Sequence, residues 1–211
     1  MIKKEKLIKE LKDKNVYTDL VKKALRQAEI SHAGQKRDNG SCNLENHIYS
    51  VTYSILKRYT NHKMLKDLVI LALLHDTMED DEDFDEGVCL KSFGKEICKN
   101  VKKLTKDEGS FKKYSNSNKY FYELKKFFCN KDYIENVNGS NEICKIVKLE
   151  DRIDTLRGIE EIGNSVTDLR YVMEAETLFV EMAKKTKSFD YLPILKKETK
   201  RLSTYSPKIA T

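Results

Sequence analysis

The chain has 211 residues, a formal net charge of +6 and 35% charged residues, so it is long enough for one domain with a sizeable core. Its five cysteines are odd in number and lack C-x-x-C spacing, which argues against a zinc ribbon and a disulfide framework. No apolar run is long enough to span a bilayer, and the first 13 residues do not resemble a signal peptide. We therefore expect a cytoplasmic protein with reduced thiols.

The first third of the chain has the pattern of helices joined by polar turns. We expect a short amphipathic helix over residues 2–14 and a second helix from the N-cap Thr18 to about Ala33. A loop rich in Gly and Asn follows, and His47 lies early in a third helix. Residues 61–62 form a turn before the central stretch.

Residues 68–82, LVILALLHDTMEDDE, form the central stretch of the sequence. Seven consecutive apolar residues end in His75-Asp76, and their number favours a buried helix over a strand. On one continuous helix, Glu79 would lie one turn beyond His75, and Asp80 one turn beyond Asp76. Buried imidazoles and carboxylates are costly unless they are paired or hold a metal. A core helix with a satisfied His and a solvated acidic end would explain this stretch equally well by itself.

The rest of the chain is also predicted to be helical. No segment has the pattern of a strand, so the expected fold is an all-α bundle. We expect a loop over 84–93, a helix over 94–104, a mobile loop over 105–118, a helix over 120–129, a turn at 138–141, a second strongly apolar helix over 142–159 and closing helices over 168–186 and 192–202.

The histidines and buried aspartates suggest a metal site. His47, His75, Asp76 and Asp151 would form a mixed nitrogen and oxygen ligand set, which suits Mn, Fe or another divalent ion. These residues come from three different predicted helices, so their spacing alone is a weak signal. Asp151 followed by Arg152 is also compatible with an ordinary salt bridge.

Three sequence blocks in order make the signal more specific. SHAGQKR with a following His, ALLHDTMEDD and KLEDRIDTLR together resemble the HD-domain phosphohydrolases. Within them, the chain is most similar to the RelA/SpoT hydrolase domain and to small alarmone hydrolases of the stringent response. The resemblance covers about residues 20–160 closely. It implies one HD-type helical domain over 1–211, with closing helices over about 168–202.

The resemblance also implies roles for individual residues. The implied activity is metal-dependent 3′-pyrophosphohydrolysis of guanosine tetra- or pentaphosphate, with Mn²⁺ as the divalent cofactor and a nucleotide as the small-molecule partner. No membrane or nucleic-acid partner is expected. The implied metal ligands are His47, His75, Asp76 and Asp151, the water-activating pair is Glu79 and Asp80, and the substrate side comprises Arg37, Lys148, Thr155 and His32.

The chain departs from the family pattern mainly in the loop over residues 38–46. This loop lacks the usual Pro-Tyr before the first metal His and is one residue longer than usual, while Glu150 replaces a small Ala in the last block. Two alternatives therefore stay open: an HD phosphohydrolase acting on another nucleotide, and a degenerate HD fold acting as a regulatory or binding module. Nucleic-acid binding has only the mild basic excess in its favour.

Overall fold

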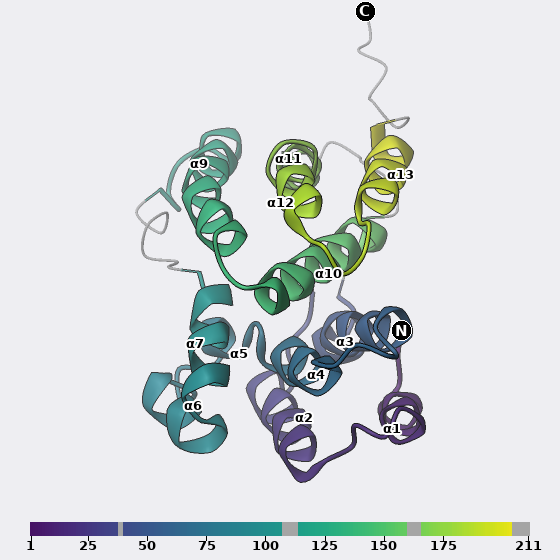
Figure 1. The fold of residues 1–211 in the computed structure, drawn as a ribbon. Helices are drawn as coiled ribbons and strands as arrows, with labels where there is room; N and C mark the ends of the chain where they lie inside the picture. Colours follow the sequence, from purple (N-terminus) through teal and green to yellow (C-terminus); the bar gives the residue numbers. More distant parts are fainter. Residues whose placement is uncertain (38–39, 107–113, 160–165, 204–211) are drawn as a thin grey trace, which may run out of the picture. The chain divides into compact units, whose positions relative to one another are not determined.

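A computed structural model describes residues 1–37, 40–106, 114–159 and 166–203 (Figure 1). The expected all-α fold is confirmed, because within these ranges the only β-type pairing is an isolated antiparallel bridge between Lys36 and Cys42. The chain divides into two compact units, Met1–Lys106 and Asp107–Thr211. The single domain over 1–211 stays a prediction, and the two units are described separately.

The first unit is built around α4 (Leu65–Leu74), which is apolar on every side. Every residue from Leu68 to Leu74 is buried, as expected for a helix without a polar face. The helices α2 (Asp19–Ser31), α3 (Tyr49–Arg58) and α7 (Lys95–Leu104) all contact α4, and α1 (Lys4–Asp13) contacts α3. Thr18 caps α2 as expected, since its hydroxyl accepts from the Val21 N–H at 3.4 Å.

The continuous helix expected over residues 68–82 is wrong, because α4 ends at Leu74. His75 and Asp76 form a turn, and a short helix, α5 (Thr77–Asp80), follows. Side chains cap the end of α4: the Thr77 hydroxyl donates to the Leu74 carbonyl at 2.7 Å, and His75 Nδ1 lies 2.8 Å from the Ala72 carbonyl oxygen. The turn separates His75 and Asp76 from the Glu79 and Asp80 side chains, so the one-turn offsets expected from the sequence do not hold.

The loop expected over 84–93 is also wrong, because α6 (Glu86–Phe93) occupies most of it. Asp85 is the N-cap, and its carboxylate accepts from the Val88 N–H at 2.8 Å. Cys89 and Phe93 are buried on the inner face of this helix. Gly94 then joins α6 to α7 with φ of +81°, a left-handed conformation that suits glycine.

The second unit is built around α10 (Glu142–Gly158), which contacts every other described α-helix of the unit. Those helices are α9 (Lys119–Asn138), α11 (Val166–Glu174), α12 (Val180–Lys185) and α13 (Leu192–Ser203), with a π-helical turn, η2 (Ala175–Phe179), between α11 and α12. The expected helices over 142–159, 168–186 and 192–202 are confirmed, and that over 120–129 is longer than expected. Most of the expected 105–118 loop, residues 107–113, lies outside the described residues.

A buried charge cluster ties α9, α10 and α11 together. Glu174 on α11 accepts from Arg152 of α10 and from Arg170, both at 2.6 Å, and Arg170 also donates to Glu123 of α9 at 2.6 Å. Asn130 donates to Glu174 as well. Burial by itself would raise the pKa of Glu174, but the two guanidinium groups outweigh it and hold the pKa below its ordinary value. The cluster therefore depends on Glu174 staying ionised.

No helix within the described ranges combines the length and apolar character needed to cross a membrane.

Candidate metal centre and active site

His47 is placed by a π-helical turn, η1 (Leu44–Ile48), which runs directly into α3. This turn contacts both α2 and α3, and His47 and Ile48 are buried within it. A π-turn widens the helix by one residue and re-aims its side chains, and such turns are frequent at functional sites. The local distortion therefore directs a buried imidazole toward the end of α4.

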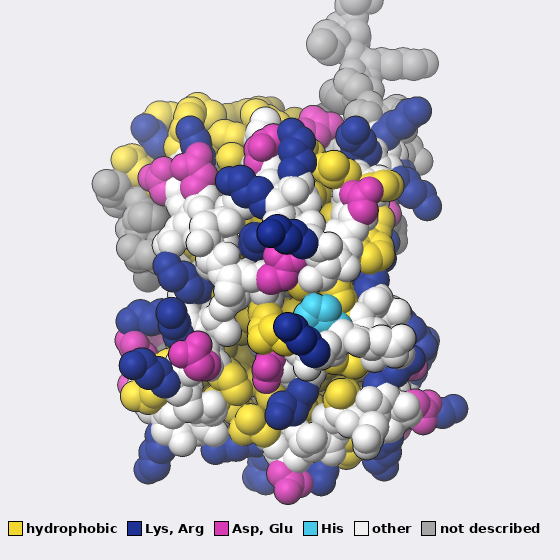
Figure 2. All heavy atoms as spheres, viewed as in Figure 1, with side chains coloured by type: hydrophobic (Ala, Val, Ile, Leu, Met, Phe, Trp, Pro, Cys, Tyr) yellow, Lys and Arg dark blue, Asp and Glu magenta, His cyan; other side chains and the backbone are white. Residues whose placement is uncertain are grey.

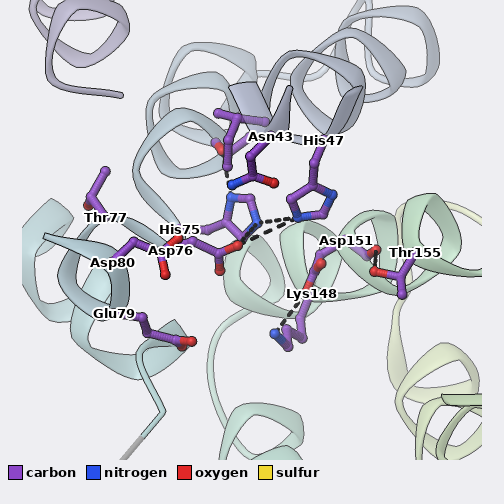
Figure 3. Close-up of polar contacts among 12 residues, drawn as sticks. Asn43, His47, His75, Asp76, Thr77, Glu79, Asp80, Lys148, Asp151 and Thr155 are labelled. Carbon is purple, nitrogen blue, oxygen red and sulfur yellow. Dashed lines mark hydrogen bonds and ion pairs between the residues drawn. The ribbon is translucent and has the colours of Figure 1, made fainter. Parts of the chain in front are cut away.

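Two imidazoles and one carboxylate meet at the end of α4 (Figure 3). His75 Nε2 lies 3.3 Å from His47 Nε2 and 3.2 Å from the Asp76 carboxylate, while His47 Nε2 lies 3.5 Å from the same Asp76 oxygen. The two histidines are almost completely buried. The structure thus brings together three of the four metal ligands expected from the sequence.

The protonation of this group follows from its partners. A carbonyl oxygen can only accept, so the contact of His75 Nδ1 with Ala72 places a proton on Nδ1 and leaves Nε2 of the neutral ring with a lone pair facing His47 and Asp76. Burial alone would raise the pKa of Asp76, but His75 and His47 together hold it well below its ordinary value. Asp76 is therefore a carboxylate at neutral pH.

The three atoms fit a divalent cation. An ion about 2.1 Å from each ligand atom holds neighbouring ligands roughly 3.0 to 3.4 Å apart at octahedral or tetrahedral angles. The three separations, 3.2, 3.3 and 3.5 Å, are close to that range. Two nitrogens and one oxygen, without a thiolate, suit Mn, Fe or Zn ions. The Nδ1 contact of His75 fixes its ring in the manner common for metal-binding histidines.

Glu79 lies on α5 and its carboxylate is bound by Lys106. One carboxylate oxygen accepts from the Lys106 backbone N–H at 2.7 Å, and the other lies 3.4 Å from the Lys106 ammonium group. The Glu79 side chain is only 8% exposed. A residue 27 positions away in the chain therefore fixes the orientation of this carboxylate.

Asp80, the neighbouring carboxylate, contacts α2 instead. Its Oδ2 lies 3.3 Å from Nδ1 of His32, and the same nitrogen lies 2.7 Å from the Gln35 side-chain oxygen. His32 is buried, and its Nε2 has no hydrogen-bond partner among the described residues. Next to it, the Ser31 hydroxyl donates to Asp81 at 2.6 Å. The end of α2 thus holds α5 through side chains on both sides of Asp80.

Arg37 lies in a short loop between α2 and η1. Its N–H donates to the Ser41 carbonyl at 2.9 Å, and the Asn43 N–H donates to the Gln35 carbonyl at 3.0 Å, so the base of the loop is closed. The Asn43 amide also donates to the Gln35 side chain at 2.8 Å. Arg37 is half-buried. Residues 38–39, the tip of the altered 38–46 loop, lie outside the described residues.

In the second unit, α10 carries the remaining residues expected from the sequence. The Lys148 ammonium donates to the Asp151 carboxylate at 2.7 Å and lies over the Tyr133 ring. Lys148 is almost fully buried, whereas Asp151 is partly exposed. Thr155 donates to the Asp151 carbonyl at 3.1 Å. The expected roles of Lys148, Asp151 and Thr155 stay predictions.

Sequence reasoning missed three residues that hold the site: Lys106, Gln35 and Asn43. Lys106 falls at the start of a stretch read as a polar loop, and nothing in its neighbours signals a contact 27 residues back. Gln35 and Asn43 are eight residues apart, and their pairing depends on the closed loop between them. For these two, polar residues flanking a Gly-containing loop were the available signal.

Comparisons with known proteins bear on the fold. No protein-family model matches this sequence, and no curated protein matches it either. A similar solved structure is that of a metazoan ortholog of SpoT, which is described as hydrolysing ppGpp and playing a role in starvation responses. It is 20% identical, with a TM-score of 0.65, and the match covers 87% of this chain and 96% of that chain. The chain therefore has the all-α fold of that SpoT ortholog, as the resemblance implied.

Proposed function

We propose that this protein is a metal-dependent phosphohydrolase that cleaves guanosine tetra- or pentaphosphate at the 3′ position and releases pyrophosphate. The observation that carries the proposal is the close approach of His47 Nε2, His75 Nε2 and an Asp76 oxygen, all within 3.5 Å of one another. Its fold resembles that of a protein described as hydrolysing ppGpp, which favours this substrate class.

The proposed metal ligands are His47, His75 and Asp76 of the first unit, with Asp151 of α10 as a further oxygen ligand. Manganese is the proposed ion, because the set contains nitrogen and hard oxygen donors. When bound, such an ion lowers the pKa of a coordinated water and polarises a phosphoryl oxygen. The ionised state of Asp76, maintained by the two imidazoles, prepares this ligand set at neutral pH.

Glu79 and Asp80 are proposed to divide the handling of the attacking water. Hydrogen bonds to a carboxylate favour its ionised form and weaken it as a proton acceptor, and Glu79 receives such bonds from Lys106. We therefore assign Glu79 to orienting the water and Asp80 to accepting its proton. His32 orients Asp80 through Nδ1. General bases positioned in this way contribute about 10² to 10⁴ in rate.

The substrate side is proposed to comprise Arg37, Lys148 and Thr155. The planar guanidinium group of Arg37 suits stacking on a purine, and its loop is closed at the base, so the side chain starts from an ordered backbone. The Lys148 ammonium would offset phosphate charge. Thr155 would contribute a hydroxyl that can accept while it donates to the helix backbone.

The first experiment measures pyrophosphate release from guanosine tetraphosphate with and without added manganese. Manganese-dependent release that is absent in Asp76→Ala would support both the centre and the substrate. Bound metal without release would keep the phosphohydrolase and redirect the search to a panel of other nucleotides, as the altered 38–46 loop suggests. Absence of both metal and release would contradict the proposal and favour a non-catalytic module.

A further inference from the structure

Helix α9 has an exposed apolar face that the proposed activity does not use. Ten large hydrophobic side chains are exposed among the described residues, and six of them lie on α9 and α11. On α9, Tyr120 is 70% exposed, Phe128 56%, Leu124 49% and Phe121 42%. Helix α11 contacts α9 and exposes Leu169 and Met173. Apolar side chains gather over the ends of these two helices (Figure 2), and clusters of this kind mark interaction sites.

The exposed residues of α9 have the spacing of a helix-pairing seam. Phe121, Leu124 and Phe128 are separated by three and then four residues, the spacing at which one helix packs along another. The buried residues of α9, namely Glu123, Asn130, Ile134 and Val137, lie on a different face. Helix α9 therefore has one face that packs within its own unit and a second, apolar stripe that is exposed to solvent.

The charges beside this seam favour a second copy of the same helix in the antiparallel direction. Lys125 and Asp132 are seven residues apart, so they lie on the same flank of the helix. Neither forms an ion pair with another residue of the described ranges; Lys125 instead lies over the Tyr114 and Phe121 rings. In an antiparallel pair related by a two-fold axis, equal flanks meet, so Lys125 of each copy faces Asp132 of the other.

The available area is compatible with a dimer of modest stability. About half of each of the six side chains is exposed, or roughly 100 Å² each, which gives roughly 600 Å² of apolar surface per copy. Stable complexes bury about 800 Å² per partner, polar rim included. A dimer of this size should dissociate on dilution, so concentration is the variable to test.

We propose that α9 is a self-association surface, through which two copies of this chain pair in antiparallel orientation along Phe121, Leu124 and Phe128. Two symmetric ion pairs, each between Lys125 of one copy and Asp132 of the other, fix the direction. The antiparallel arrangement also opposes the two helix dipoles. The surface uses none of the residues assigned to the metal centre, so this inference and the proposed activity can fail independently.

The test is sedimentation velocity of the full chain across the micromolar range. The wild type should pass from monomer to dimer, and Leu124→Glu or Phe128→Glu should stay monomeric at concentrations about tenfold higher. Leu90→Glu is the matched control, because Leu90 is an equally exposed leucine on α6. Circular dichroism and pyrophosphate release should be unchanged in all three variants, which separates loss of pairing from loss of folding.

Charge exchange tests the direction of pairing. Lys125→Glu alone and Asp132→Lys alone should each weaken the dimer about tenfold, and the double variant should restore it. Mixing the two single variants should also give a dimer, because both ion pairs re-form only in the antiparallel arrangement. A wild-type chain that stays monomeric throughout, or dimers unaffected by Leu124→Glu, would overturn the proposal. A monomer that binds vesicles containing phosphatidylglycerol through Leu124 would instead assign the face to lipid.

Discussion

Asp76 contacts both imidazoles of the candidate metal centre, so its removal tests the centre most directly. We expect Asp76→Ala to lose bound manganese and reduce pyrophosphate release to background. The fold should persist, since the apolar residues of α4 supply the core of the first unit. Elemental analysis, activity and circular dichroism on the same preparation are the measurements.

Asp83→Ala is the matched control for this change, because Asp83 is an exposed aspartate seven residues further along the chain. It should keep both the metal and the activity. Full activity in Asp76→Ala would remove this carboxylate from the ligand set, whatever its contacts with the two histidines.

Lys106 allows its two contacts with Glu79 to be separated. Lys106→Met removes the ammonium group and keeps the backbone N–H, so turnover should fall less than about tenfold. Lys106→Pro also removes the N–H that lies 2.7 Å from Glu79, so turnover should fall further. Thr105 is already extended, with φ of −76° and ψ of 126°, so it tolerates a following proline.

The readouts for Lys106 are kcat, its pH profile and metal content, with Lys99→Met as the exposed-lysine control. Metal content should be constant in all three variants because Lys106 does not contact the three proposed ligands of the first unit. Equal losses in Lys106→Met and Lys106→Pro would show that the backbone contact does not position Glu79.

At the scale of the element, the end of α6 that the sequence hid is a measurable feature. Asp85→Ala should destabilise the first unit by about 0.5 to 2 kcal/mol, because the Val88 N–H loses its capping acceptor. Urea unfolding monitored by circular dichroism gives the free energy of unfolding. Glu82→Ala, an exposed acidic residue outside any helix, should change it by less than about 0.5 kcal/mol.

The elements that could be predicted from the sequence are those whose own pattern determines them. The apolar stretch over 68–74 and the mixed pattern over 142–159 gave α4 and α10, and Thr18 was identified as a cap. The break after Leu74 could not be predicted, because it depends on the Thr77 hydroxyl and the His75 imidazole taking backbone carbonyls. The helix α6 was hidden by the acidic, Gly-containing run before it.

The charge cluster of α9, α10 and α11 gives the second unit a pH dependence. The pKa of Glu174 is held below its ordinary value of 4.5, so the unfolded chain binds this proton at a higher pH than the folded chain does. The stabilisation is therefore fully present above about pH 4.5 and is lost as the pH falls through the lower, folded-state pKa. Glu174→Gln should cost about 3 to 5 kcal/mol at pH 7, because two buried guanidinium groups lose their counter-charge.

Urea unfolding between pH 3 and pH 7 measures both effects. The slope of stability against pH should be smaller in Glu174→Gln than in the wild type, since the shifted group is gone. Glu176→Gln, two residues away and exposed, should leave both the stability and its slope unchanged. An unchanged slope in Glu174→Gln would show that other carboxylates set the acid sensitivity.

At the scale of the whole molecule, the sequence order of the motifs indicated the fold more reliably than any single motif did. The match to the SpoT ortholog covers 87% of this chain, which is more than either unit contains. The site was predictable as a list of residues, since His47, His75 and Asp76 do meet. Their supporting contacts were not, because Lys106 and Gln35 bond partners that only the folded chain brings near.

The proposed role of Asp151 makes a prediction about both units. If Asp151 is a ligand, manganese should stabilise α10 as well as α4, because an ion present at 100 times its Kd adds about 2.7 kcal/mol to whatever holds it. Hydrogen exchange measured by mass spectrometry should then show slower exchange on adding manganese in peptides from 65–74 and from 142–158. Asp151→Asn should abolish the effect on the second peptide and weaken it on the first. Asp154→Asn, on the same helix, should leave both effects intact. Protection of 65–74 alone in the wild type would restrict the metal site to His47, His75 and Asp76, and would remove Asp151 from the ligand set.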